Sequence, residues 1–416
     1  MTASDTRGAI DAVWRIEAPR LIAGITRIVR DVGLAEDLAQ DALVAALEQW
    51  PAAGVPDNAG AWLMATAKHR AIDRLRRDQR LDRKHEQLGR ELEAEERMAS
   101  ADVHSGNDDD LLRLIFLSAH PVLTTDARVA LTLRLLGGLT TDEIARAFLV
   151  PEATIAQRIV RAKRALAAGA VAFEVPEASD LAERLGSVLQ VIYLIFNEGY
   201  AATAGDDWMR AGLCEDALRL GRILAELAPA EPETHGLVSL MEIQASRAPA
   251  RVSETGEPIL LLDQDRGRWD RLLVHRGLAA LARAEAQGGP PGPYVLQAEI
   301  AACHGRAPTP ADTGWPGIVG YYDQLARIER SPIVELNRAV AYGMAFGPAR
   351  ALALVDALIG EPSLAGYHLL PSVRGDLLAK LGRSFEAHAE FERAAALAQN
   401  ARERAFLLRR AAECAQ

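Results

Sequence analysis

The chain has 416 residues, of which 49% are apolar and 25% are charged; this favours two or more globular domains and excludes wholesale disorder and a collagen-like repeat. No stretch approaches about 18 uncharged apolar residues, and the N-terminus lacks the basic and apolar parts of a signal peptide, so we expect a soluble, cytoplasmic protein. The three cysteines are far apart and have no histidine partners at zinc spacing, so we predict no disulfide, no metal site and no cofactor.

The formal net charge of −10 is unevenly distributed along the chain. From Lys68 to Lys84 there are eight basic and three acidic side chains. A second basic cluster consists of four residues, Arg158, Arg161, Lys163 and Arg164. Two local basic stripes on an acidic chain indicate two confined contacts with phosphate groups.

The periodicity of the sequence predicts an all-α fold, because apolar residues recur every 3.6 positions and no long run alternates with period two. Residues 10–50 are expected to form two helices separated near Gly33. In the second, 34–50, the pattern places Leu38 inward and Glu36 outward.

A Pro/Gly loop is expected over 51–60, with Asn58 as the N-cap of a helix over 61–80. The following residues, 85–110, are acidic and have few large apolar side chains. They are typical of a linker between domains.

The segment 137–168 carries the most specific local pattern. Thr140, with Glu143 three residues later, forms a capping box that begins a short helix over 141–148. A break ending at a proline separates this helix from a second one over 152–168. Helix, three-residue turn and helix at this spacing predict a helix-turn-helix.

On the second helix the pattern points Ile155, Ile159 and Val160 inward. Polar residues that can contact DNA occupy overlapping outward faces: Thr154, Gln157, Arg158, Arg161 and Arg164. Arginine and glutamine can bond base edges in a major groove, although an ordinary helix pair with a solvated basic face remains an alternative.

The helix over 61–80 carries the other basic stripe, with Lys68, Arg70, Arg74 and Arg77 facing outward. This stripe could be a solvated face. A basic helix beside an irregular loop could also hold a DNA backbone while the loop accepts an unstacked base.

These segments, 33–50, 61–80 and 125–166, resemble regions 2 and 4 of extracytoplasmic-function (ECF) RNA polymerase sigma factors, in the usual order. The rest of the chain is similar to the C-terminal extension of a subgroup described as having a tetratricopeptide-like (TPR-like) domain. The resemblance implies four parts: region 2 over 8–84, an acidic linker over 85–110, region 4 over 111–170 and a TPR-like domain over 177–416.

The resemblance also implies a promoter-specificity subunit that binds RNA polymerase core enzyme and promoter DNA. Polymerase contacts would come from Asp37, Gln40 and Asp41. DNA contacts at the minus-ten element would come from Lys68, His69, Arg70, Arg74 and Arg77, with His69 standing where the family usually has asparagine. DNA contacts at the minus-thirty-five element would come from Thr154, Gln157, Arg158, Arg161 and Arg164, and the loop 51–60 would accept the flipped minus-ten base.

The C-terminal extension fits a TPR-like unit at Gly375, Ala387, Phe391 and Ala394. We expect stacked helical hairpins with irregular insertions at 248–267 and 288–294. Such a domain could bind a protein or peptide partner, or it could only pack on its own sigma regions. We expect it to organise the two DNA-binding regions, so that truncation after Pro176 abolishes transcription.

Catalysis has little support, because the sequence lacks the common nucleotide-binding, hydrolase and metalloprotease motifs. The polar clusters at 197–200 and at Cys303-His304 are interpreted as packing features. We therefore predict that the chain is not an enzyme. A free-standing helix-turn-helix regulator with a TPR-like sensing domain is the alternative function, and an adaptor that binds no DNA is a third.

Overall fold

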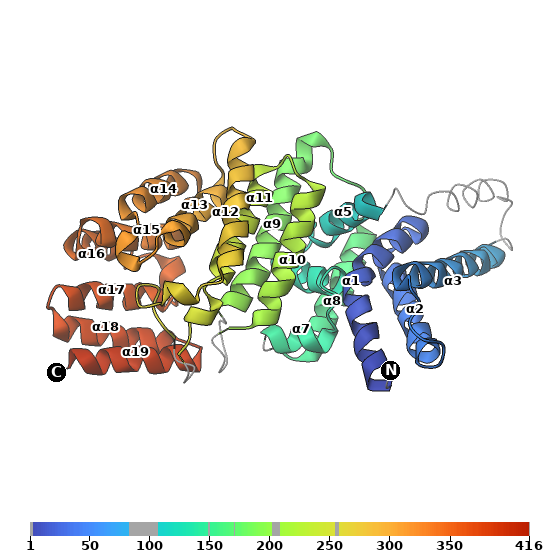
Figure 1. Ribbon diagram of the computed structural model, residues 1–416, viewed down its shortest axis with the longest axis horizontal. Helices are drawn as coiled ribbons and strands as arrows, with labels where there is room; N and C mark the ends of the chain where they lie inside the picture. The colour runs from blue at the N-terminus through green and yellow to red at the C-terminus, as the bar shows by residue number, and fades with distance from the viewer. Residues whose placement is uncertain are drawn as a thin grey trace. The chain divides into compact units, whose positions relative to one another are not determined.

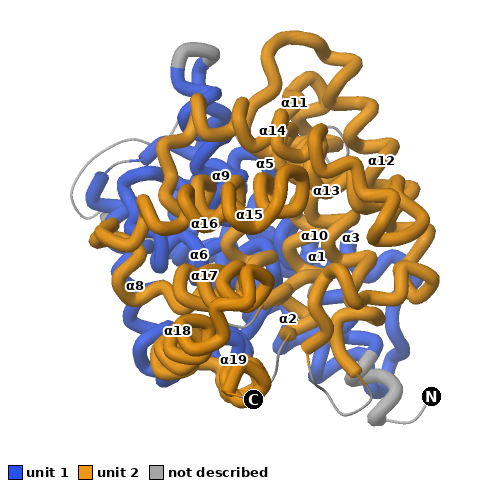
Figure 2. The backbone as a smooth tube through the Cα atoms, turned by 90° about the vertical axis from the view of Figure 1, so that its left-hand side faces the viewer, with its two compact units in different colours: residues 1–192 blue, residues 193–416 orange. Residues whose placement is uncertain are grey.

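A computed structural model describes residues 3–82, 107–148, 150–169, 171–201, 209–253 and 258–415 (Figure 1). Within these residues the regular structure is helical, with one isolated β-bridge between Val252 and Pro258 and no strand, which confirms the all-α prediction. The chain divides into two compact units, residues 1–192 and 193–416 (Figure 2). No helix of the described part has the length and apolar content needed to cross a membrane.

The first unit contains seven described helices and the start of an eighth. They are α1 (Ala3–Val29), α2 (Val32–Ala53), α3 (Ala59–Asp82), α5 (Asn107–Ser118), α6 (Thr125–Leu135), α7 (Thr141–Phe148), α8 (Glu152–Ala168) and α9 (Ala178–Tyr200). Helix α1 packs on α2 and α3 and also on α5. The helices before and after residues 83–106 therefore share one core.

The first two helices are separated at Arg30 and Asp31, slightly before the predicted break at Gly33. Arg30 has the left-handed φ of 55° that ends α1, and the Asp31 carboxylate caps α2 by accepting from the backbone N–H of Leu34 at 2.8 Å. Asn58 is confirmed as an N-cap, since its side chain accepts from the N–H of Ala61 at 2.9 Å.

The helix-turn-helix has the predicted bounds. The N–H of Thr140 donates to the Glu143 carboxylate at 2.8 Å, and the N–H of Glu143 donates to the Thr140 hydroxyl at 3.1 Å, which confirms the capping box. Ile155 and Ile159 of α8 are buried as expected. The expectation for Val160 is wrong, because this side chain is 46% exposed.

Most of the predicted acidic linker lies outside the described residues, but its last four residues belong to α5. Asp110 is only 2% exposed and pairs with Arg113 of its own helix and Arg27 of α1. Helix α5 therefore begins inside the predicted linker, four residues before its expected end. A pattern of consecutive acids does not reveal that one of them has two arginine partners.

The division between the units falls inside α9, later than the predicted boundary at 176. The start of α9 is bonded to the first unit: Arg184 donates to the carbonyl of Phe116 at 3.2 Å, and Ser187 donates to the carbonyl of Ala119 at 2.6 Å. The predicted domain bounds stay predictions, but these contacts attach residues after 176 to the helix-turn-helix side of the chain.

The second unit continues as a succession of helices that mostly pack on their neighbours in sequence, except that α13 packs mainly on α11 and little on α12. They are α10 (Ala211–Leu227), α11 (Pro232–Ala245), α12 (Arg271–Ala286), α13 (Pro293–Arg306), α14 (Trp315–Ile328), α15 (Pro332–Phe346), α16 (Pro348–Asp356), α17 (Leu369–Lys380), α18 (Ser384–Leu397) and α19 (Ala401–Cys414). The predicted irregular insertions lie between α11 and α12 and between α12 and α13. In the first, the described residues hold two short 3-10 turns.

The last three helices form a core around Phe391, which is 1% exposed. A Cβ atom at Gly375 of α17 would lie 3.1 Å from the Phe391 ring of α18, so glycine lets the two helices approach closely. The predicted small and large residues thus meet where α17 and α18 pack.

Phe391→Ala should lower the free energy of unfolding of the second unit by about 3–5 kcal/mol, because it removes a fully buried ring and leaves a cavity. Urea denaturation followed by circular dichroism measures the change. Phe385→Ala, on the same helix but at a side chain that is 87% exposed, is the matched control and should shift stability by at most about 0.5 kcal/mol. Similar losses in both variants would contradict this packing.

Candidate nucleic-acid interface

The predicted DNA-reading helix α8 presents an exposed polar face. Gln157, Arg161 and Arg164 are exposed, and Thr154 is half-buried. Arg158 is half-buried and pairs with Asp126 of α6 at 2.7 Å. An exposed pair of this kind contributes at most about 1 kcal/mol, so Arg158 could exchange Asp126 for a phosphate group at low cost.

The predicted stripe on α3 is less uniformly exposed than its sequence suggests. His69, Arg74 and Arg77 are exposed, while Lys68 and Arg70 are half-buried. The Arg70 guanidinium lies 3.6 Å from the carboxylate of Asp41 on α2. One ion pair thus joins a residue predicted to bind DNA to a residue predicted to bind polymerase.

The predicted polymerase-binding residues of α2 differ in their surroundings. Asp37 and Asp41 are exposed, but Gln40 is half-buried and donates to the Glu36 carboxylate at 2.7 Å. Glu36 itself is 3% exposed, so its predicted outward position is wrong. Its carboxylate lies between α2 and the helix-turn-helix.

Glu36 forms two ion pairs between the α1–α3 segment and the α5–α8 segment, which the Arg27–Asp110 pair also joins. Nε of Arg134, from α6, and Nζ of Lys163, from α8, each lie 2.5 Å from one of its carboxylate oxygens. Arg134 also donates to the carbonyl of Leu139 at 3.1 Å. One buried carboxylate therefore binds two cations that lie about a hundred residues further along the chain.

The electrostatics of this carboxylate favour the charged form. Burial alone would raise the pKa of Glu36, but Lys163 and Arg134 together outweigh burial, so its pKa lies below the ordinary value of 4.5. The pKa of Asp110 is shifted in the opposite direction. Its burial outweighs Arg27 and Arg113 and raises its pKa.

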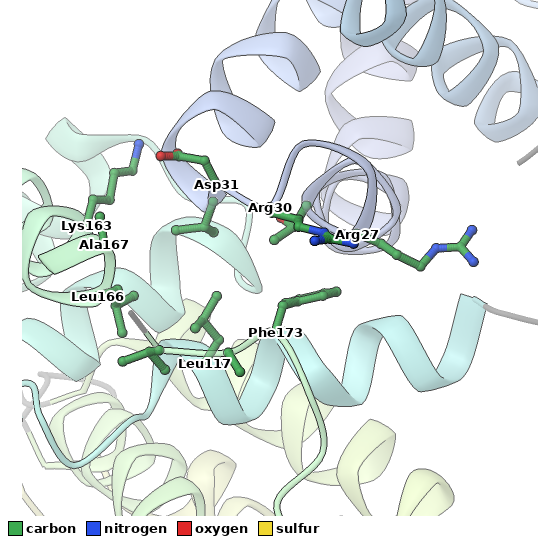
Figure 3. A pocket seen from close by; sticks show the side chains of 12 residues that line it. Arg27, Arg30, Asp31, Leu117, Lys163, Leu166, Ala167 and Phe173 are labelled. Atoms are coloured by element: carbon green, nitrogen blue, oxygen red, sulfur yellow. The ribbon is translucent and has the colours of Figure 1, made fainter. Parts of the chain in front are cut away.

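A cavity of about 420 Å³ also lies between the α1–α3 and α5–α8 segments, at the boundary that we call the seam (Figure 3). Its walls come from the α1–α2 junction with Arg27 and Arg30, from α8 with Lys163 and Leu166, and from the segment after α8 with Phe173. A cavity removes packing contacts from both sides. The seam therefore depends more on its ion pairs than a close-packed core would.

Sequence reasoning missed Glu36 as an interior residue and missed Arg134 altogether. A helical signal was present, since Glu36 stands four residues after the buried Val32 and three before the buried Ala39. Its long-range partners had no such signal. Among the described residues, no group of three or more His, Cys, Asp or Glu side chains is placed to hold a metal ion.

The first unit thus combines a helix-turn-helix with a second helix that carries exposed basic residues. Residues 14–81 match the sigma-70 region 2 family, and residues 113–166 match the sigma-70 region 4 family. Residues 184–285 match a family of unknown function, DUF6596. No catalytic family is indicated by these matches.

One relative matches nearly the whole chain, and two named sigma factors match part of it. The chain is 44% identical, over 96% of its length and 94% of the relative, to an uncharacterized protein of Rhizobium meliloti. It is 32% identical to a probable RNA polymerase sigma-C factor of Mycobacterium bovis and to the ECF RNA polymerase sigma factor SigC of Mycobacterium tuberculosis, over 38% of this chain and 77% of each relative. The chain belongs to the RNA polymerase sigma factor family.

Glu36→Gln removes the charge at the seam between regions 2 and 4 while keeping the side-chain shape. It should lower the free energy of unfolding of the first unit by about 3–5 kcal/mol at pH 7, because two partly buried cations lose their counterion. Since the pKa of Glu36 is depressed on folding, its contribution is complete above pH 4.5 and is lost as the pH falls through its lower folded value. Urea denaturation at pH 7 and pH 3 tests both parts.

Glu48→Gln is the control for this variant, because Glu48 is exposed on the same helix. It should change stability little at either pH. If the Glu36 and Glu48 variants behave alike, the seam does not depend on the buried carboxylate.

Proposed function

We propose that this sigma factor is of the ECF type and directs promoter-specific initiation through two DNA contacts. Region 4 reads the minus-thirty-five element with α8, and region 2 holds the minus-ten element with α3. The observation that carries the proposal is the presence of exposed arginines on both helices: Arg161 and Arg164 on α8, and Arg74 and Arg77 on α3.

The minus-ten and minus-thirty-five elements are too far apart for the compact first unit to contact both of them at once. About 25 base pairs of B-DNA extend for roughly 85 Å, whereas a compact unit of 192 residues is only about 40 Å across. Regions 2 and 4 must therefore separate before both can contact one promoter. A chain as long as residues 83–106 reaches at most about 80 Å, which is enough for this separation.

The ion pairs of Glu36 with Arg134 and Lys163 must break on separation, as must the packing of α1 on α5 and the Arg27–Asp110 pair. Opening leaves Arg134 and Lys163 without their carboxylate, and polymerase or DNA phosphates then supply new partners. We infer that free protein is closed and that core polymerase selects the open form, because only the open form has both DNA-binding faces at promoter spacing.

We further propose that the C-terminal extension controls region 4 through α9. Support comes from the bonds of Arg184 and Ser187 to the carbonyls of Phe116 and Ala119, and from the continuity of α9 across the division after Ile192. Because α9 is continuous, we expect a displacement of its second half to displace its first half as well. A protein or peptide partner of the extension could act in this way.

Arg161→Ala should weaken binding of the holoenzyme to promoter DNA by about 1–3 kcal/mol if Arg161 contacts a base. In vitro transcription with purified core polymerase, on promoters selected from random DNA by the holoenzyme, measures the effect. Arg283→Ala, an exposed arginine of the second unit, is the control. Undiminished transcription by Arg161→Ala would reject the assignment, and promoter binding without core polymerase would favour the free-standing regulator.

Truncation after Ile192 should abolish transcription. It removes the extension, which we propose repositions region 4, and so leaves regions 2 and 4 in their closed arrangement. The fragment 1–192 keeps the start of α9, whereas 1–176 loses its bonds to region 4 and serves as the comparison. Transcription at matched soluble levels is the measurement. Equal or higher output from 1–192 would mean that the extension only inhibits.

A further inference from the structure

A cluster of buried guanidinium groups surrounds Trp269 in the second unit. The Arg247 and Arg266 guanidinium carbons lie 5.5 Å and 5.3 Å from the centre of the Trp269 ring. A third arginine, Arg251, stacks 3.5 Å above the ring of Tyr200 and donates to its carbonyl. Arg247 adds to the positive field felt by both other arginines, which lowers the pKa of each below its already burial-depressed value.

Arg247 is the least compensated member of the cluster. It is 8% exposed, and its Nε is buried without a hydrogen-bond partner among the residues that the structure describes. Its contact with Trp269 attracts the cation but does not neutralise it. A buried charge without a counterion is strongly unfavourable, so binding of an anion beside Arg247 would be favourable.

Arg266 is held in place by neutral groups only. It donates to the carbonyls of His304 and Ala307, at 3.0 Å and 2.8 Å, and to the hydroxyl of Thr313 at 2.8 Å. These bonds fix the guanidinium at the end of α13, and its Nε has no partner. The Arg266 guanidinium is thus oriented by hydrogen bonds to neutral groups, and the carboxylate of Asp312 offsets part of its charge without a hydrogen bond to it.

The remaining unsatisfied atoms nearby are mostly donors. The indole Nε1 of Trp269 is buried without a partner, as is Nδ1 of His304. Burial, together with Arg247 and Arg266, lowers the pKa of His304 to about 3, so its imidazole is neutral and can carry one N–H. Water could satisfy these donors but could not neutralise two guanidinium groups.

We propose that this cluster is a binding site for a small oxyanion, the phosphate or carboxylate group of a small molecule, held by Arg247 and Arg266 beside Trp269. Guanidinium groups bind such oxyanions through charge-assisted, often bidentate hydrogen bonds. Three of its residues, Arg247, Arg266 and Trp269, lie within 184–285, so the site gives this segment of unknown function a ligand class.

Isothermal titration of the full chain with inorganic phosphate, and separately with acetate, tests the site, with sodium chloride at matched ionic strength as the reference. We expect saturable binding of at least one oxyanion and none of chloride. Arg247→Met should weaken that binding at least tenfold. Arg268→Met, an exposed arginine in the same short turn as Arg266, should leave it unchanged.

The absence of saturable binding of both oxyanions would overturn the proposal, and so would equal losses in the two variants. If Arg247→Met does not fold, thermal unfolding of the wild-type chain decides the question: phosphate or acetate must raise the midpoint above that in chloride, and an equal midpoint overturns the site. These measurements use neither polymerase nor DNA, so their outcome is independent of the proposed promoter contacts.

Discussion

A buried carboxylate joins the two halves of the sigma module, together with the packing of α1 on α5 and the Arg27–Asp110 ion pair. Glu36 of region 2 lies between Arg134 and Lys163 of region 4, and Lys163 also lines the cavity between the two segments. A buried ion pair is costly to break but contributes little beyond a hydrophobic contact of similar shape. Such a contact suits a connection that holds in free protein and yields when polymerase and DNA offer other partners.

The same helix that carries Glu36 also carries the predicted polymerase-binding residues. Gln40 donates to Glu36, and Asp41 pairs with Arg70 of α3, so docking on α2 would disturb the seam and the minus-ten stripe together. On the other side, Lys163 belongs to the predicted DNA-reading helix. If these residues bind as we propose, the ion pair between Glu36 of α2 and Lys163 of α8 would couple polymerase binding, DNA binding and the separation of the two regions.

Local sequence patterns predicted most of the helices, but they did not predict ion pairs between residues far apart in the sequence. The bounds of α7 and α8 and the caps at Asn58 and Thr140 follow from residues within four positions of each other, and the structure confirms them. Glu36 was assigned to an exposed face, and Asp110 to a linker, because partners such as Arg134, Lys163 and Arg27 stand far away in sequence. The division between the units inside α9 was also missed. The proline-containing segment before α9 marks the start of a helix, but the first residues of that helix still pack on the first unit.

The most direct test of the account is the distance between regions 2 and 4. Spin labels at the exposed Ala52 of α2 and Ala156 of α8, in a chain whose three cysteines are replaced by serine, report it by pulsed electron paramagnetic resonance. We expect one short distance in free protein and a distance longer by several tens of ångströms in a complex with core polymerase and promoter DNA. An unchanged short distance in a complex that initiates transcription would contradict the account.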